Sequence, residues 1–438
     1  MPGQTLTALR NGDLAGAREL TLRDDLAEFP REIFALADTL EVLDLSGGAL
    51  TSLPDDLGRL TRLRVLFCSG NRFERLPSSL GDCAALSQVG FRGCGLREVP
   101  AEALPSGLRW LTLTDNAIET LPAALGERPL LQKLMLSGNR LEALPDSLAG
   151  HSRLELLRLS ANRFEALPGW LAEAPSLAWL AWAGNPFDHG APPPVRTIAW
   201  SALRLGRRLG EGASGQVHAA DWIDGAETRP VALKLFKGAM TSDGLPEREM
   251  AACLAAGEHP HLTGALGRLA DHPADVQGLV MALLPPAWRV LAGPPSLESC
   301  SRDVYDSSLR LDLDVALRIA RDVGAGALHL HAKGLSHGDL YAHNVLWDGG
   351  AGQAVLSDLG GASFLPGGPG DPLDRLDVLA WGRLLGELLE RCEDESPAAI
   401  RALRADCTRP EVAGRPSMAE AVDALARNLP DLDWPDPD

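Results

Sequence analysis

Lysine is scarce in this 438-residue sequence. Only four of its 41 basic residues are lysines. A lysine inside a motif is therefore informative, because chance places few of them there. The four are Lys133, Lys234, Lys237 and Lys333.

Long apolar runs, cysteine motifs and a basic surface are also missing. No apolar run approaches the roughly 20 residues that span a bilayer, so we expect no membrane segment. The seven cysteines form no CxxC pair or regular framework, which favours a reducing compartment. The formal charge of −18 argues against binding to nucleic acid or anionic lipid, because phosphate contacts need a basic surface.

The first residues, MPGQTLTALRNGDL, have neither a basic region nor a following apolar stretch, so we expect no secretory signal. Together with the cysteine usage, this predicts a cytoplasmic protein. The preference for arginine, alanine and leucine indicates a GC-rich bacterial genome. The length is sufficient for two or three domains, each with its own core.

A pattern of 15 residues repeats along the first part of the sequence. Examples are LEVLDLSGGALTSLP from residue 40, LRVLFCSGNRFERLP from 63 and LQKLMLSGNRLEALP from 131, and successive starts are 22 or 23 residues apart. A weaker unit, ARELTLRDDLAEFP (17–30), comes first, after a short helical pattern that would cap the open end. Such a strict period indicates a solenoid whose stacked repeats share one core.

These repeats resemble the leucine-rich repeat family, LxxLxLxxN/CxL, over roughly residues 17–187. The resemblance implies a horseshoe-shaped α/β solenoid whose leucines point inward from short strands. It also implies a ladder of polar side chains that satisfies backbone groups where the chain turns, with Gly48 breaking it early. The ladder residues are Asn71, Cys94, Asn116, Asn139, Asn162 and Asn185.

Alternate side chains of each predicted strand face out from the concave surface. These positions form a more apolar row than exposure to water favours. We predict that either a separate protein partner or substrate, or the chain's own C-terminal domain, docks on this concave row. The row consists of Val42, Val65, Phe67, Trp110, Met135, Leu156 and Trp179.

A proline-rich stretch, APPPV at 191–195, follows the last repeat and predicts a stiff, extended connector. We therefore divide the chain into a repeat domain with an N-terminal helical cap (1–188), a linker (189–200) and a C-terminal domain (201–438).

The C-terminal part contains a series of short motifs. The first, GEGASGQV (210–217), has the pattern GxGxxGxV, in which glycines let backbone amides approach phosphates. Alone, this motif fits a dinucleotide loop or a surface hairpin equally well. The stretches that follow are VALK (231–234), the helical LPEREMAACLAAGEHPHL (245–262), LVMALLPP (279–286), HGDLYAHN (337–344), VLSDLGG (355–361), LDVLAWG (376–382) and GRPS (414–417).

In this order the motifs resemble the protein kinase family, from residue 203 to about 428. The resemblance implies an α+β bilobal kinase-like domain that uses ATP and Mg²⁺. In it, Met281 is the gatekeeper beside the adenine. The residues implied to bind the nucleotide are Gly210, Gly212, Ala213, Ser214, Gly215, Val217, Ala232, Lys234, Met281, Ala282 and Leu284.

The same resemblance assigns the catalytic roles. Lys234 contacts the phosphates and pairs with Glu249, with Glu247 as the less favoured alternative. Asp339 is the catalytic base, and Asp377 braces its loop. The implied metal ligands are Asn344 and Asp358.

Two positions of the catalytic loop depart from the family pattern. Gly338 replaces the arginine that in many kinases pairs with a phosphorylated activation loop. Tyr341 replaces the lysine that touches the transferring phosphate, and His343 is a speculative substitute for it. These changes put regulation by loop phosphorylation, and the usual acceptor, in question.

The segment after Asp358 is also unusual. It is short, contains Ser363 as its only hydroxyl, and lacks the glutamate that normally pairs with Arg415. An insertion at 287–312 has no role that we can assign. We predict a site that is constitutively arranged or controlled by a partner.

Three functions are compatible with this sequence. We favour an ATP-dependent protein kinase acting on serine or threonine, with the repeats recruiting a substrate or partner, because all five polar anchors of the family are present. The alternatives are a pseudokinase-type scaffold or switch, and a kinase for a small molecule.

Overall fold

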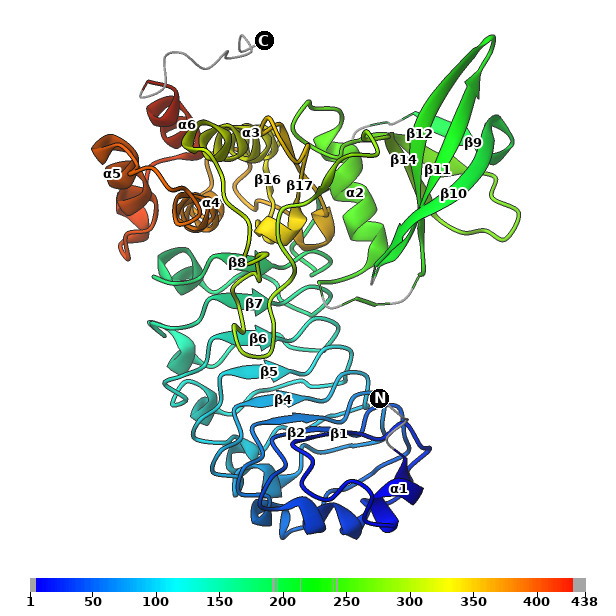
Figure 1. Cartoon of the computed structure of the whole chain (residues 1–438), viewed down its shortest axis with the longest axis vertical. Helices are drawn as coiled ribbons and strands as arrows, with labels where there is room; N and C mark the ends of the chain where they lie inside the picture. The colour runs from blue at the N-terminus through cyan, green and yellow to red at the C-terminus, as the bar shows by residue number, and fades with distance from the viewer. Residues whose placement is uncertain are drawn as a thin grey trace. The chain divides into compact units, whose positions relative to one another are not determined.

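The structure, a computed structural model, describes residues 5–190, 194, 196–212, 214–238, 240, 241 and 243–427. The chain divides into two compact units, Met1–Ala174 and Pro175–Asp438 (Figure 1). The last repeat follows Ala174 and so belongs with the second unit, although the sequence groups it with the other repeats. The end of the repeat domain at residue 188 and the start of the C-terminal domain at residue 201 remain predictions.

The first unit is a stack of short strands that pair in parallel. Each strand pairs with the next in sequence, and equivalent leucines lie opposite each other, as Leu43 does with Leu66. Both leucines are fully buried, as the repeat pattern predicts. The elements are α1 (Leu6–Arg10), β1 (Glu19–Thr21), β2 (Val42–Asp44), β3 (Val65–Phe67), β4 (Gln88–Gly90), β5 (Trp110–Thr112), β6 (Lys133–Met135) and β7 (Leu156–Arg158).

The return segments of these repeats are short 3-10 turns, which fit the few residues that a 22- or 23-residue period leaves for them. In the later repeats a proline precedes the turn and its fixed φ sets the entry direction, as Pro122 does before η5. The turns are η1 (Arg31–Leu36), η2 (Leu57–Arg59), η3 (Ser78–Leu80), η4 (Ala101–Ala103), η5 (Ala123–Leu125), η6 (Asp146–Leu148) and η7 (Gly169–Glu173).

The polar ladder has the geometry that the repeats imply. The Asn71 side-chain amide donates to the carbonyl oxygens of Leu45, at 2.9 Å, and Cys68, at 2.8 Å. Its oxygen accepts from the Leu50 amide at 2.9 Å. The buried turn thus keeps its backbone groups hydrogen-bonded, which limits the cost of burying them.

The second unit begins with the last repeat and continues into a six-stranded sheet. The strand order in that sheet is β10-β11-β12-β14-β13-β9, with β9 parallel to β13 and the other pairs antiparallel. Strand β9 lies inside the predicted linker, whose residues 191–193 and 195 are outside the described residues. The strands are β8 (Trp179–Ala181), β9 (Thr197–Ala199), β10 (Leu203–Glu211), β11 (Gly215–Asp224), β12 (Glu227–Phe236), β13 (Ala265–Ala270) and β14 (Gly278–Ala282).

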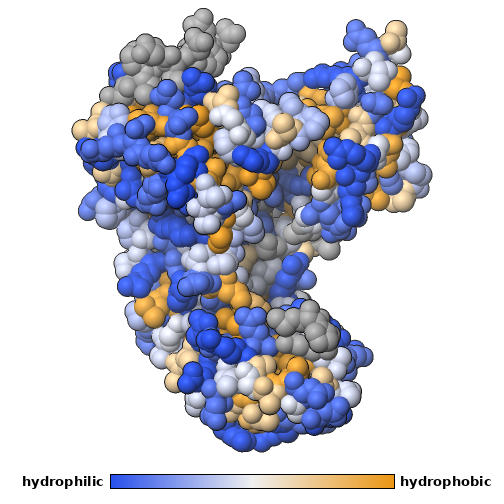
Figure 2. Space-filling model, in the orientation of Figure 1, coloured by the Kyte–Doolittle hydropathy of each residue, from blue (hydrophilic) through white to orange (hydrophobic). Residues whose placement is uncertain are grey.

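A small core of Trp222, Val231, Leu233 and Val280 holds this sheet together. Some apolar side chains of β10 and β11 remain at the surface, among them Leu205, which is 42% exposed. Figure 2 shows hydrophobic residues interspersed with hydrophilic ones over these strands. Helix α2 (Pro246–Ala256) follows the sheet strand β12 and begins with Pro246, a residue suited to the first helical position.

The remainder of the second unit is mainly helical. Helix α3 (Leu313–Ala332) buries one face, including Leu317, Ala320 and Leu330, and packs against α4 and α6. Short strands between α3 and α4 position the catalytic-loop motif. The elements are η8 (Trp200–Ala202), β15 (Arg289–Val290), β16 (Leu335–Ser336), η9 (Ala342–Asn344), β17 (Val345–Trp347), β18 (Ala354–Leu356), η10 (Leu359–Gly361), β19 (Ser363–Phe364), α4 (Asp374–Leu389), α5 (Ala398–Cys407), η11 (Val412–Gly414) and α6 (Met418–Arg427).

Candidate functional site

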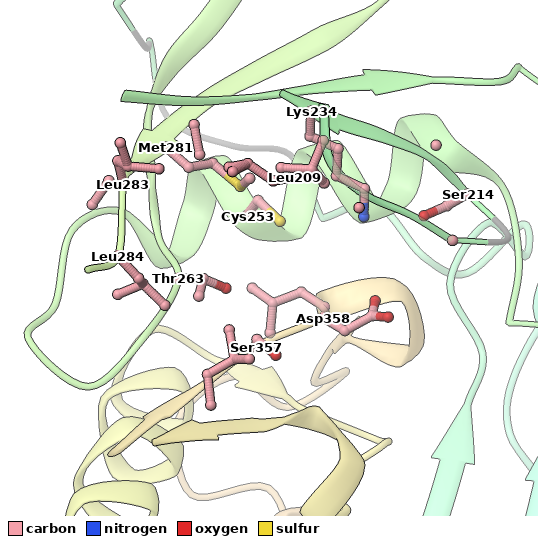
Figure 3. Close-up of a pocket in the computed structure, with 18 of the residues that line it drawn as sticks. Leu209, Ser214, Lys234, Cys253, Thr263, Met281, Leu283, Leu284, Ser357 and Asp358 are labelled. Carbon is pink, nitrogen blue, oxygen red and sulfur yellow. The ribbon is translucent and has the colours of Figure 1, made fainter. Parts of the chain in front are cut away.

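A cavity of about 660 Å³ lies between the six-stranded sheet and the segment that contains Ser357 and Asp358 (Figure 3). Its volume is within the range typical of small-molecule sites. Figure 3 shows Lys234 and Asp358 at one end and Met281, Leu283 and Leu284 toward the other. The cavity thus has a charged end and an apolar end, which suits a ligand with one anionic and one apolar part.

The glycine-rich hairpin between β10 and β11 forms one wall of the cavity. Space is open beside Gly210 and Gly212, whereas a Cβ on Gly215 would lie 2.3 Å from the carbonyl oxygen of Leu235. Only glycine therefore lets β11 start this close to β12. The Lys237 ammonium donates to the Gly212 carbonyl at 3.1 Å and pairs with Glu211, which fastens the hairpin tip.

The predicted nucleotide residues of this region nearly all line the cavity. The exception is Ala213, which is outside the described residues. Those lining the cavity are Gly210, Gly212, Ser214, Gly215, Val217, Ala232, Lys234, Met281, Ala282 and Leu284.

Lys234, on β12, forms an ion pair with Glu249 of α2. The Glu249 side chain is 4% exposed and that of Lys234 13%. Burial lowers the pKa of Lys234, but the Glu249 and Asp358 carboxylates outweigh burial and hold that pKa above its ordinary value. The ammonium therefore stays charged at the anionic end of the cavity. Glu247, the less favoured sequence alternative, does not occupy this position.

The catalytic-loop motif brings Asp339 and Asn344 together. The Asn344 side-chain amide donates to the Asp339 carboxylate at 2.9 Å and to the Asp339 carbonyl at 2.8 Å. The Ser357 amide and hydroxyl both donate to the Asn344 carbonyl at 2.8 Å. Through Ser357, the residue before Asp358, the loop is joined to the wall of the cavity.

His337 fixes the backbone on the other side of Asp339. Its Nδ1 accepts from the Asp339 amide at 3.2 Å, and its Nε2 lies 3.2 Å from the Ser357 carbonyl. Because Nδ1 accepts, the proton is on Nε2, which donates to that carbonyl. Burial lowers the pKa of His337, so the ring stays neutral and retains this tautomer.

The carboxylate of Asp377, at the start of α4, accepts hydrogen bonds from the catalytic loop. Its Oδ2 accepts from the His337 amide at 2.8 Å and from the Ser336 hydroxyl at 3.1 Å, and its Oδ1 accepts from the Gly338 amide at 3.0 Å. Oδ2 also lies 2.9 Å from His331 Nε2. Burial raises the pKa of Asp377, but these donors reverse the effect and leave that pKa below its ordinary value.

Asp358 has a left-handed backbone conformation, with φ of 58°. This is unusual for a residue other than glycine and is found mostly where the surrounding structure enforces it. Its Oδ1 accepts from the Gly360 amide at 3.1 Å. The carboxylate of Asp358 and the side-chain oxygen of Asn344 are the hard oxygen donors that Mg²⁺ prefers, so the residues present fit that ion.

Comparison with known proteins matches two segments of the chain. A family described as "Protein tyrosine and serine/threonine kinase" matches residues 203–365, and one described as "Leucine rich repeat" matches residues 129–187. The chain combines leucine-rich repeats with a protein kinase domain. The fold predicted from the two motif series is therefore confirmed, with the kinase match covering the cavity, Lys234, Asp339 and Asp358.

Individual proteins resemble one segment or the other. Disease resistance protein RPS4B of Arabidopsis thaliana is 32% identical over 122 residues, 27% of this chain and 10% of its own. Kinase suppressor of Ras 2 of Homo sapiens is 26% identical over 171 residues, 37% of this chain and 15% of its own. Serine/threonine-protein kinase PkaB of Streptomyces coelicolor is 30% identical over 168 residues, 36% of each chain. The matches thus span about a third or less of these relatives.

The kinase domain differs from the sequence expectation on its acceptor side. Tyr341, at the position of the phosphate-contacting lysine, is only 5% exposed and is not among the residues that line the cavity. His343 Nδ1 lies 2.7 Å from the Asp303 carboxylate of the 287–312 insertion. That insertion therefore has at least one contact role, which the sequence left unassigned.

Arg415 of the kinase domain lacks the glutamate partner that is usual in the family. It donates hydrogen bonds to backbone carbonyls instead. It donates to Arg409 at 2.9 Å and to Pro175 at 2.7 Å, and it is 3% exposed. Burial lowers its pKa to about 10, still well above neutrality. The arginine thus keeps its charge without a carboxylate partner.

Sequence reasoning missed several residues of the cavity wall. Cys253 lies one helical turn after Glu249 on α2, Thr263 follows that helix, and Leu346 lies opposite the hairpin in the wall. The i, i+4 spacing from Glu249 was a usable signal for Cys253. Thr263 and Leu346 come from segments that carry no motif.

Within the described residues, no helix is both long and apolar enough to cross a membrane.

Proposed function

We propose that this protein is an ATP- and Mg²⁺-dependent protein kinase that phosphorylates serine or threonine. The observation that carries the proposal is the placement of Lys234, Glu249 and Asp358 in the wall of one cavity. Asp339 and Asn344 are hydrogen-bonded to each other in the loop that Ser357 joins to that wall. These five side chains come from four separate motifs. A fold retained only as a scaffold has no need to keep all of them in place.

Each of these residues has a chemical task in the proposed reaction. Lys234, charged and held by Glu249, would contact the nucleotide phosphates. Asp339, oriented by Asn344, would accept the proton of the acceptor hydroxyl. Asn344 and Asp358 would hold Mg²⁺, which supplies positive charge against the charge that develops on the transferred group.

The apolar end of the cavity suits the adenine ring. Leu209, Val217, Ala232 and Met281 present apolar surface there. In our proposal the backbone groups of Ala282 and Leu284 bind the edge of the base, since β14 ends at Ala282 and frees the following residues from strand pairing. The relative described as a serine/threonine-protein kinase supports the same acceptor class.

In this proposal the repeats recruit a protein substrate or partner through the part of the concave row that lies in the first unit, which excludes Trp179. Within the first unit, Phe67 and Trp110 meet edge to face, with ring centroids 6.2 Å apart, and the Lys133 ammonium lies 4.1 Å from the Trp110 ring centre. Aromatic side chains are enriched in protein-binding surfaces. The cytoplasmic location and the bacterial source remain predictions from composition.

Phosphate transfer from labelled ATP tests the proposal. The full chain is incubated with Mg²⁺ and generic protein acceptors, beside Asp339→Asn. We expect label on protein and a loss of about 10²- to 10⁴-fold in the variant, the usual contribution of a general base. Equal labelling by the two proteins would refute the assigned role of Asp339.

A second candidate function is a nucleotide-binding scaffold or switch. It is favoured by one observation, the burial of Tyr341 where a phosphate-contacting lysine is expected. ATP binding without any turnover would select it. ATP consumption that depends on Asp339, with no labelled protein, would instead select a small-molecule acceptor.

A further inference from the structure

The last repeat, residues 175–190, packs on the catalytic loop inside the second unit. The rings of Trp179 and Tyr341 stack with centroids 4.0 Å apart and planes inclined by only 9°. The Trp179 indole N–H donates to the Leu340 carbonyl at 3.0 Å. Trp179 is 2% exposed. The loop that carries Asp339 is therefore held by both a ring stack and a hydrogen bond.

The same repeat also holds the segment that follows Asp358. The Trp182 amide donates to the Ser363 hydroxyl at 3.0 Å, and the Trp182 indole N–H donates to the Phe364 carbonyl at 3.1 Å. Ser363 and Trp182 are both completely buried. Ser363 is thus inaccessible to a modifying enzyme in this arrangement, because its hydroxyl is covered by the repeat.

The two departures of the catalytic loop match this packing. Gly338 has φ of +66°, and a Cβ there would lie 2.5 Å from the carbonyl oxygens of both Leu180 and Gly361. An arginine at position 338 has no room beside the repeat. Tyr341 provides the flat ring on which Trp179 stacks. Both departures from the family pattern therefore lie against the last repeat.

Further contacts tie the repeat to other parts of the kinase domain. Arg248 of α2 pairs with Asp188 and donates to its carbonyl at 2.8 Å. Arg383 of α4 donates to the Ser176 carbonyl at 3.1 Å and lies over the Trp179 ring. The repeat is thereby fixed relative to α2, which carries Glu249, and to α4, which carries Asp377.

We propose that the last repeat is a permanent positioning element for phosphate transfer, with Trp179 as its central positioning residue. It orders Asp339 through Tyr341 and Leu340, and orders the segment after Asp358 through Trp182. In this way it takes over the ordering that a phosphorylated loop provides elsewhere. The inference rests on the proposed kinase function, although the contacts that carry it do not.

Steady-state kinetics of the full chain test this role. Trp179→Ala removes the stack and the hydrogen bond, and we expect kcat to fall about 10- to 100-fold, the scale of a misplacement near 1 Å. The KM for ATP stays within about threefold, because Trp179 is not part of the cavity. Trp179→Phe keeps a stacked ring and retains kcat within about fivefold. The matched control is Trp170→Ala in η7 of the first unit, which leaves kcat unchanged.

Hydrogen exchange separates failure of this inference from failure of the proposed function. Without any substrate, Trp179→Ala speeds exchange of the backbone amides in 337–344 and 359–364, and Trp170→Ala does not. This result supports the inference even if the wild-type protein transfers no phosphate. Wild-type exchange in both segments, or an equal rise throughout the second unit, would overturn it. A KM effect without a kcat effect would overturn it as well.

Discussion

The nucleotide side and the acceptor side of the kinase domain are stabilised by different kinds of interaction. On the nucleotide side, charged and polar groups meet one another: Lys234 pairs with Glu249, and Asp339 binds Asn344. On the acceptor side, the family's charged positions have become Gly338 and Tyr341, and aromatic packing replaces them. The nucleotide side keeps the polar groups that phosphate transfer needs. On the acceptor side, permanent packing contacts stand in place of charged residues that could respond to phosphorylation.

This difference indicates where control has been lost and where it has not. A charged receptor for phosphate can switch a loop between two states, because the interaction exists only when phosphate is present. Stacked rings and buried amide bonds exist all the time. The acceptor side is therefore expected to be permanently ordered, which leaves nucleotide and partner binding as the remaining points of control.

After Asp339→Asn, the next largest effect is expected on the nucleotide side, from Lys234→Met. Loss of the phosphate contact should lower kcat/KM about 10²- to 10³-fold, and it leaves Glu249 buried without its partner. Phosphate transfer and the thermal shift produced by ATP are the measurements. The control is Lys333→Met, which alters an exposed lysine at the end of α3. Activity above a third of wild type in Lys234→Met would contradict the assigned role.

On the acceptor side, Gly338→Ala should cost about 2 to 4 kcal/mol of stability, because it adds strain at a positive φ and a clash with two carbonyl oxygens. Gly350→Ala is the matched control, since a Cβ at Gly350 meets nothing within 4 Å. We expect it to change stability by about 0.5 kcal/mol or less. Urea unfolding measures both. Equal effects would show that the repeat does not restrict position 338.

The nucleotide side contains recognisable sequence motifs for a physical reason. Phosphate and metal chemistry requires particular side chains at particular spacings, so Lys234 and Asp339 are visible in VALK and HGDLYAHN. The repeats were equally visible, because a solenoid core needs leucines at a fixed period. Glu249 was assigned from the resemblance to the kinase family, and in the structure it is Glu249, not Glu247, that pairs with Lys234.

The acceptor side was not predictable in the same way. Trp179 was identified only as one of seven outward residues, and nothing in the sequence selected Tyr341 as its partner. Arg415 binds the carbonyl of Pro175, a group that every residue type possesses. The absence of its usual glutamate therefore suggested a lost contact, whereas the arginine donates hydrogen bonds to backbone carbonyls. Long-range packing and backbone acceptors leave no pattern in the sequence.

Ser363→Ala is expected to have a smaller effect. It removes the acceptor of the buried Trp182 amide, so stability should fall by about 1 to 3 kcal/mol while phosphate transfer persists. Ser363→Asp should be more destabilising, because it buries a carboxylate. Both variants are compared in unfolding and transfer assays. If Ser363→Ala abolished activity and Ser363→Asp restored it, control by phosphorylation would replace permanent ordering.

The smallest effect concerns pH and His343. Burial lowers the pKa of His343, but Asp303 outweighs burial and raises that pKa above its ordinary value of 6.5. A raised folded-state pKa contributes stability that is complete below 6.5 and is lost as pH rises through the folded value. The stability difference between wild type and His343→Asn should therefore be larger at pH 6 than at pH 8.5. A difference that grows with pH would contradict the ion pair with Asp303.

Because of the last repeat, the kinase domain defined by sequence motifs and the compact structural unit begin at different residues. A fragment that starts at residue 201 would contain every residue that the motifs assign to catalysis, yet it would uncover the ring of Tyr341 and leave Arg415 without the Pro175 carbonyl. The smallest fragment that keeps these contacts starts at residue 175. Duplication or loss of repeats would leave these contacts intact only upstream of residue 175, so the last repeat belongs with the kinase domain rather than with the repeats it resembles.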